Sequence, residues 1–253
     1  MHAISQDSIH PTEQQILGFL ADEVKLVTVH SNTMSVVEGD SDPFTLYTLR
    51  VTCPATKIWW IIKRRYSQFH ALRQSLVRAH KKFFRGTSLA SLLLAVAELA
   101  FPKKALRLDT SVIVAERKVA FDVMTKTLMA VRADCVVFAL QHDQSMPMRL
   151  LNQLRAVQSA LDGFLAIPDV QKKEELRVLV DHVSPHSGHR HDGDETDDEC
   201  SICLCALADI SQDGEPLRLG CGHAFHEECV LHWLDVQMSC PLCREPSGWG
   251  GLL

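Results

Sequence analysis

Eight cysteine and histidine side chains at short spacings mark the C-terminal part of this 253-residue chain. They are Cys200, Cys203, Cys221, His223, His226, Cys229, Cys240 and Cys243. A Cys-x-x-Cys turn brings two thiolates to one tetrahedral zinc ion at about 2.3 Å, and two further ligands complete the site. Eight ligands therefore complete two sites with none left over. The pattern predicts two zinc ions in this segment rather than disulfides.

The ligand-bearing segment is too small to fold on an apolar core alone. It spans about 45 residues with few large apolar ones, below the size at which such a core usually suffices. We expect zinc to supply much of its folding free energy, on the order of 10 kcal/mol or more per site. The remaining cysteines, Cys53, Cys135 and Cys205, are interpreted as small apolar residues.

The ligand order C-x2-C-x17-C-x-H-x2-H-x2-C-x10-C-x2-C resembles that of a RING finger of the two-histidine type. The resemblance implies cross-brace ligation, in which the first, second, fifth and sixth ligands share one zinc ion. The first site would then hold Cys200, Cys203, His226 and Cys229, and the second Cys221, His223, Cys240 and Cys243.

RING fingers of this type bind a ubiquitin-conjugating enzyme charged with ubiquitin and hold its thioester in a reactive arrangement, without a covalent intermediate of their own. The resemblance assigns conjugating-enzyme binding to Ile202, Trp233 and Pro241. Arg244 matches the basic linchpin that bridges conjugating enzyme and ubiquitin. Local packing around the zinc loops is the alternative for Ile202 and Trp233, but aromatic and arginine anchors are usual in interfaces.

The residues before this segment follow the order of an α+β domain, with strands first and helices after them. Residues 24–37 are rich in Val and Thr, Phe44–Cys53 alternates, and Lys57–Arg64 carries two tryptophans. Helical periodicity then starts at Ser67 and returns after Asp109. The predicted fold class is α+β: a three-stranded antiparallel sheet with a helical subdomain, plus the small zinc-bound cross-brace domain.

Composition divides the chain into five segments. They are a leader at 1–21, the α+β domain at 22–167, a helix and acidic linker at 168–199, the zinc domain at 200–246 and a tail at 247–253. The acidic run at 192–199 cannot bury apolar surface and predicts a flexible linker. A formal net charge of −5 argues against nucleic-acid binding by bulk charge. The N-terminus lacks the apolar core of a signal peptide, so an intracellular protein is expected.

A basic segment, Lys63-Arg64-Arg65-Tyr66, ends the third predicted strand. Arginine offers paired donors for phosphate, and a helix N-terminus adds oriented N–H groups, although a solvated strand end is the alternative. Together with Phe101-Pro102-Lys103-Lys104 and Glu116-Arg117, this segment resembles a phox-homology (PX) domain over residues 22–167.

The PX resemblance implies binding of phosphoinositide, most often phosphatidylinositol 3-phosphate. Arg65 would hold the 3-phosphate, Tyr66 would pack on the inositol ring, Lys104 would contact the 1-phosphate and Arg117 the 4- and 5-hydroxyls. Residues 132–147 depart from the family pattern and look like an insertion. Residues 88–100, rich in Leu and Ala, are interpreted as a helix packed on the sheet or, alternatively, as a loop that inserts into a membrane.

The sequence thus predicts a RING-type ubiquitin ligase recruited to the cytoplasmic face of an endosomal or vacuolar membrane. Its partners would be a ubiquitin-conjugating enzyme, ubiquitin, a phosphoinositide surface and protein substrates that the sequence does not specify, with no nucleic acid. Two alternatives remain. One is a lipid-binding trafficking adaptor whose zinc module only binds protein, and the other is a ligase whose N-terminal domain binds protein instead of lipid.

Overall fold

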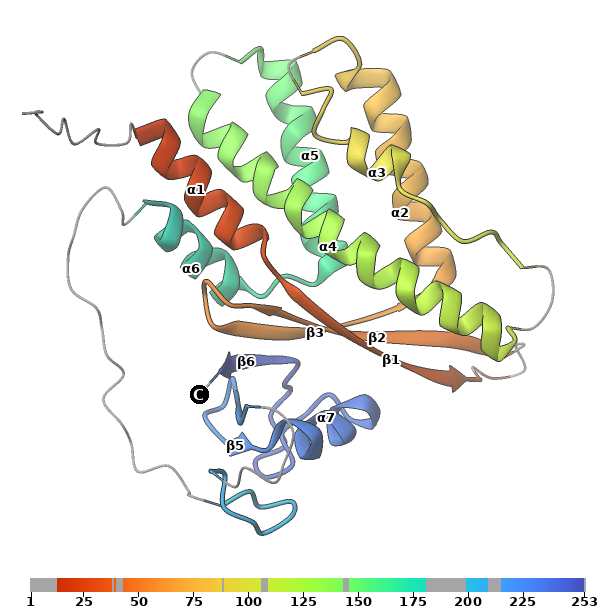
Figure 1. Ribbon diagram of the computed structural model, residues 1–253, viewed down its shortest axis with the longest axis vertical. Coiled ribbons are helices and arrows are strands. Elements are labelled where there is room, and N and C mark those ends of the chain that lie inside the picture. The colour runs from red at the N-terminus through yellow and green to blue at the C-terminus, as the bar shows by residue number, and fades with distance from the viewer. Residues whose placement is uncertain are drawn as a thin grey trace, which may run out of the picture.

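The computed structural model describes residues 13–37, 39, 43–87, 89–105, 109–142, 146–180, 199–208 and 215–252. One sheet separates two layers: helices α1 to α6 cover one face, and the zinc module with α7 covers part of the other (Figure 1). The elements are α1 (Glu13–Lys25), β1 (Thr28–Val36), β2 (Phe44–Cys53), β3 (Ile58–Arg65), α2 (Tyr66–Ala79), a π-helical turn η1 (His80–Phe84), α3 (Leu94–Glu98), α4 (Ser111–His142), α5 (Met148–Leu165), α6 (Asp169–Val180), β4 (Leu217–Leu219), β5 (Ala224–Phe225), α7 (Glu227–Val236) and β6 (Trp249–Leu252).

The sheet has six strands among the described residues, in the order β1-β2-β3-β6-β4-β5, and every pairing is antiparallel. The predicted meander β1-β2-β3 is present, but the prediction of a three-stranded sheet is wrong. Strand β6 lies in the segment that composition marks as a tail. It pairs with β3 on one side and with β4 on the other, so that Gly250 lies opposite both Trp59 and Leu219.

Strand β3 is buried on both faces, which explains its continuous apolar run. Trp60 and Ile62 belong to the core under the helices, whereas Trp59 and Ile61 belong to the core of the zinc module. Strand β2 has the same two-sided burial, with Arg50 only 8% exposed on the face away from the helices. The N-terminal sheet therefore packs against the helices on one face and against the zinc module on the other.

The helical layer is held to the sheet by an aromatic contact and a buried indole hydrogen bond. The ring of Tyr47 on β2 meets that of Phe121 on α4 edge-on with centroids 4.8 Å apart, and Trp60 Nε1 donates to the carbonyl of Leu165 at 2.9 Å. Leu93 is buried in the helical core, as the packed alternative for residues 88–100 predicts, and Leu94 is exposed. Residues 132–142, expected to be part of an insertion, continue helix α4.

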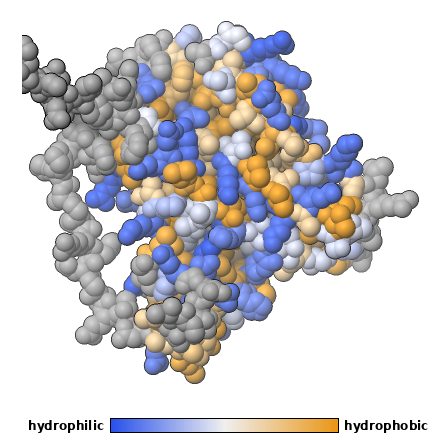
Figure 2. All heavy atoms as spheres, in the orientation of Figure 1, coloured by the Kyte–Doolittle hydropathy of each residue, from blue (hydrophilic) through white to orange (hydrophobic). Residues whose placement is uncertain are grey.

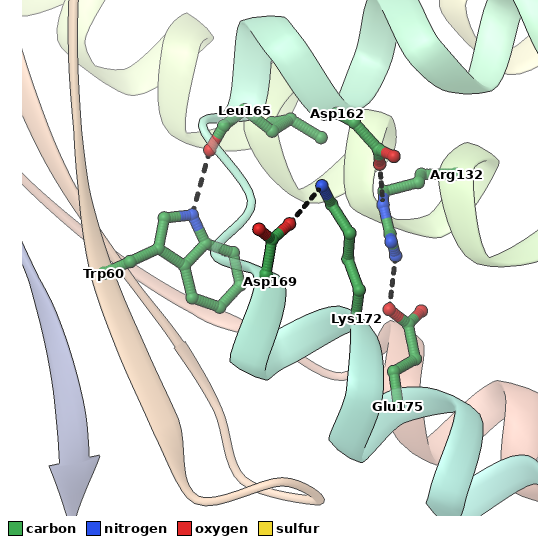
Figure 3. A network of polar contacts seen from close by, with 7 residues as sticks. All are labelled: Trp60, Arg132, Asp162, Leu165, Asp169, Lys172 and Glu175. Carbon is green, nitrogen blue, oxygen red and sulfur yellow. Dashed lines mark hydrogen bonds and ion pairs between the residues drawn. The ribbon is translucent and has the colours of Figure 1, made fainter. Parts of the chain in front are cut away.

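A buried ionic network joins three helices (Figure 3). The guanidinium of Arg132 on α4 contacts the carboxylates of Asp162 on α5 and Glu175 on α6. Helix α1 packs beside α4 and α6, with Leu20 and Val24 buried, so it begins within the segment expected to be a leader. Among the described residues, no helix is both long and apolar enough to cross a membrane.

Candidate metal centre

The eight predicted ligands meet in two groups of four. Within each group all ligand atoms lie within 4.8 Å of one another. The groups are Cys200, Cys203, His226 and Cys229, and Cys221, His223, Cys240 and Cys243. These are the two sets that a cross-brace implies, with ligands of each site drawn from alternate parts of the chain.

The two Cys-x-x-Cys loops have the same backbone geometry. In each loop the carbonyl of the first cysteine accepts a hydrogen bond from the N–H four residues later, from Leu204 to Cys200 at 2.7 Å and from Arg244 to Cys240 at 3.0 Å. Leu204 and Arg244 both adopt left-handed backbone conformations, with φ of 61° and 62°. The chain therefore reverses tightly after each thiolate pair, and the turn itself fixes the backbone of Arg244.

Hydrogen bonding fixes the ligand atom of the buried histidine. His226 is 3% exposed, and its Nε2 lies 2.9 Å from the carbonyl of Ala206, so Nε2–H donates there and Nδ1 is left for the metal. That Nδ1 lies 3.2 Å from the Sγ of Cys203. In the second group His223 Nδ1 lies 3.4 Å from the Sγ of Cys221. Thiolates with imidazole nitrogens are the donor set of structural zinc, and the geometry fits two zinc ions.

The thiols differ in how readily they ionise when no metal is bound. A backbone N–H at Cys205 lowers the pKa of Cys203 to about 6. Burial raises the pKa of Cys221 to about 11 and that of Cys229 to about 12. Zinc therefore displaces protons from thiols that would otherwise stay protonated at neutral pH, so its binding stabilises the folded loops and depends on pH.

Apolar side chains are exposed on the zinc loops. Ile202 is 41% exposed and Leu204 76%. Residues 199–208 form the end of the module farthest from the sheet, and apolar residues gather at that tip (Figures 1 and 2). Leu242, inside the last Cys-x-x-Cys, is also exposed. Sequence reasoning missed Leu204 and Leu242, although an apolar residue within or directly after a ligand pair is the available signal.

Trp233 and Pro241 are both partly buried. The indole Nε1 of Trp233 donates to the carbonyl of Ser239 at 2.8 Å, which fixes the ring on α7. The guanidinium of Arg244 lies 5.9 Å from the centre of that ring and remains exposed. The structure thus brings the predicted linchpin arginine next to one of the predicted conjugating-enzyme contacts.

Residues 198–244 match the Ring finger domain family. The C-terminal module is a RING finger. The chain is 35% identical over 94 residues to the E3 ubiquitin-protein ligase RNF181 homolog of Drosophila melanogaster, a match that covers 36% of this chain and 56% of the relative.

Two plant proteins are similar over shorter stretches. The E3 ubiquitin-protein ligase EL5 of Oryza sativa subsp. japonica is 50% identical over 48 residues, which is 18% of this chain and 14% of the relative. The probable E3 ubiquitin-protein ligase ATL44 of Arabidopsis thaliana is 49% identical over 55 residues, which is 21% and 26%. The chain therefore spans about half or less of the length of these three relatives.

The basic segment at the end of β3 divides into three environments. Lys63 turns toward the RING finger, where its Nζ donates to the carbonyl of Leu234. Arg64 donates to the carbonyl of Gly163 at 2.9 Å and so belongs to the helical layer. Arg65 is exposed, with its guanidinium 5.5 Å from the centre of the Phe44 ring. Of the three basic side chains, Arg65 is the one that the structure leaves on the open surface.

The other predicted lipid contacts lie in unlike settings. The guanidinium of Arg117 stacks 4.1 Å above the Tyr66 ring and pairs with Asp109 at 2.6 Å, and Arg117 is only 3% exposed. The hydroxyl of Tyr66 donates to the carbonyl of Pro102, and Lys104 is exposed in the segment after α3. Arg117 is therefore already charge-compensated within the fold. The resemblance of residues 22–167 to a PX domain stays a prediction.

Proposed function

We propose that this chain is a RING-type ubiquitin ligase. The observation that carries the proposal is the pair of complete four-ligand clusters, together with an exposed Ile202 on one zinc loop and Arg244 beside the Trp233 ring. Each cluster supplies four protein ligands, which is the composition of a structural zinc site, without the open position that a catalytic zinc site keeps. The chemistry assigned to this surface is therefore orientation of a charged conjugating enzyme.

Each residue has a definite part in that orientation. Ile202 offers exposed apolar area on the first zinc loop, and Trp233 and Pro241 supply further partly exposed surface. Arg244 carries a planar fork of donors that suits carbonyl and carboxylate acceptors on two proteins at once. Because its backbone is set by the turn after Cys240, no backbone freedom of Arg244 remains to be lost when the complex forms.

The test is ubiquitin transfer with purified components. The zinc-loaded protein is combined with activating enzyme, ubiquitin and a panel of conjugating enzymes, and chain formation is followed over time. Ile202→Ala should lower the rate about tenfold, as for loss of an interface anchor. Cys240→Ser should abolish transfer together with zinc binding. Val112→Ala, which trims an exposed valine on α4, is the matched control and should transfer normally.

An absence of transfer with every conjugating enzyme would contradict the ligase proposal, provided that the protein holds two zinc ions. It would favour the adaptor alternative. Arg244→Ala separates the two further, because it should reduce transfer while zinc content and conjugating-enzyme binding persist.

We also propose that the N-terminal domain directs the ligase to a phosphoinositide-bearing membrane, on the cytoplasmic side of endosomes or vacuoles. Two features support this. Arg65 is exposed directly before the N-terminus of α2, where the positive end of the helix dipole favours an anion, and Lys104 is exposed near the loop that accepts the Tyr66 hydrogen bond. Arg117, which stacks on the Tyr66 ring, would then hold that ring in place.

Vesicle co-sedimentation tests this second proposal. Binding to vesicles with phosphatidylinositol 3-phosphate should exceed binding to vesicles of equal charge made with phosphatidylserine. Arg65→Ala should remove the difference. Arg85→Ala is the matched control, because it removes one exposed arginine at the other end of the α2–η1 segment, roughly 30 Å away at 1.5 Å per residue. Equal binding by wild type and Arg65→Ala would favour a protein ligand.

A further inference from the structure

Helix α7 of the RING finger lies against the open face of the N-terminal sheet (Figure 1). At its first turn, Glu227 forms an ion pair of 2.6 Å with Arg50 of β2. At its last turn, the Nζ of Lys63 on β3 donates to the carbonyls of Leu234 at 2.9 Å and Asp235 at 2.7 Å. The sheet thus contacts both ends of one RING helix.

These contacts match the electrostatics of a helix. The last carbonyls of a helix lack partners within it and carry partial negative charge, so a cation that donates to them is favourable. Lys63 supplies that cation from another part of the chain. Burial lowers the pKa of Lys63, which shows that the amine is partly desolvated at this contact. Asn32 of β1 adds a hydrogen bond of 2.7 Å to the carboxylate of Asp235.

An apolar contact joins the two ends. Leu231 and Leu234 of α7 share one core with Trp59 and Ile61 of β3. Trp59 is fully buried there, and its Nε1 donates to the carbonyl of Gly251 in β6. The RING finger therefore builds part of its core from side chains of the N-terminal sheet.

The other side of α7 carries Trp233. At about 100° per residue, Glu227, Leu231 and Leu234 share one face of the helix, and Trp233 points to a different side of it. The helix that the sheet holds on one side thus presents a proposed conjugating-enzyme contact on another. A tilt of α7 would move Trp233 relative to Arg244, which lies beside it.

We infer that Arg50 and Lys63 are positioning residues for ubiquitin transfer, which hold α7 and Trp233 in the orientation that a charged conjugating enzyme requires. The inference rests on the proposed ligase activity. It gives the N-terminal domain a part in the transfer step itself, beyond any role in recruitment. The conjugating enzyme would also be presented at a fixed angle to the N-terminal domain.

A charge exchange tests the inference. Arg50→Glu, Glu227→Arg and the double variant are prepared in the full chain, and two zinc ions per chain are verified for each. Discharge of ubiquitin from a charged conjugating enzyme to free lysine is measured as the ligase is titrated. Each single variant should need about tenfold more protein for half-maximal discharge, and the double variant should recover most of that loss. Lys63→Met should behave like the single variants.

Glu228→Arg is the matched control, since it makes the same charge change at an exposed site in the same turn of α7, and it should titrate like wild type. If the zinc-loaded Arg50→Glu and Lys63→Met variants reach half-maximal discharge at the same concentration as wild type, the inference is overturned. Single losses that the double variant fails to recover would also overturn it. Absence of discharge by the wild type itself would overturn the ligase proposal instead, and the controls separate the two failures.

Discussion

Gly250 lies in β6 between β3 and β4, where the N-terminal sheet meets the RING finger. A Cβ at this position would lie 1.8 Å from the carbonyl oxygen of Arg218, a backbone atom that cannot move without its strand. Gly250→Ala should therefore separate β6 from β4 and lower the free energy of unfolding by about 1–3 kcal/mol, as for other overpacked sites. Denaturant unfolding followed by tryptophan fluorescence measures the change.

The neighbouring glycine gives the matched control. A Cβ on Gly251 would meet its nearest atom, the carbonyl oxygen of Lys57, at 3.8 Å, which is ordinary contact. Gly251→Ala should change the free energy of unfolding by less than about 0.5 kcal/mol. Equal losses for the two variants would show that β6 tolerates displacement and that Gly250 is not a point of close approach.

At the scale of elements, helix α6 depends on the buried network around Arg132 (Figure 3). Arg132→Met should lower the free energy of unfolding by about 3–5 kcal/mol at neutral pH, because it leaves the buried carboxylate of Glu175 and the partly exposed one of Asp162 without a cation. Burial already raises the pKa of Glu175, with Arg132 acting in the opposite direction. In the variant that pKa should rise further.

The sign of the pH dependence follows from that shift. A carboxyl group whose pKa is higher in the folded than in the unfolded chain is destabilising when ionised, and the penalty fades as the pH falls through the folded pKa. The deficit of Arg132→Met should therefore shrink on acidification. Lys172→Met is the control: it removes an exposed pair with Asp169 drawn in the same figure and should leave the free energy of unfolding nearly unchanged. A deficit of Arg132→Met that grows at low pH would contradict this account.

Local pattern was enough to predict most elements. Alternation and turn residues predicted β2 with its observed bounds, Phe44–Cys53. Ligand count and spacing predicted two zinc sites, and the resemblance to a RING finger predicted which ligands share each site. Pairings between distant segments were not predictable in this way. Strand β6 has only four residues, Trp249–Leu252, with two glycines, and its partners lie nearly two hundred residues earlier and in the RING finger.

The chemistry of the basic segment shows the same limit. Lys63, Arg64 and Arg65 are alike in sequence, yet the fold assigns them to the RING finger, the helical layer and the surface. A hint of the second layer was present in β3, since an apolar run from Ile58 to Ile62 is typical of a strand buried on both faces. The residues that cover the second face come from a distant part of the chain, so no local sequence pattern reveals them.

At the scale of the whole molecule, zinc and the N-terminal sheet should be coupled through β6. Chelation should unfold the RING finger, because zinc supplies much of its folding free energy, and should leave the helical layer intact, because its large core contains no zinc ligand. The N–H of Ile61 donates to the carbonyl of Gly248 at 2.7 Å, a bond that depends on the RING side. Its hydrogen exchange should therefore accelerate on chelation.

Amide exchange followed by mass spectrometry measures this in the full chain, with and without chelator. Peptides from β2 and α4 serve as internal controls and should keep their protection, since β2 pairs with β1 and β3 in the N-terminal sheet. Exposure of Trp59 should also shift tryptophan emission to the red. Unchanged protection of Ile61 would mean that β6 stays paired without zinc. Simultaneous loss of protection in α4 would mean that the two layers unfold as one unit. The cause would be β3, whose side chains belong to both cores.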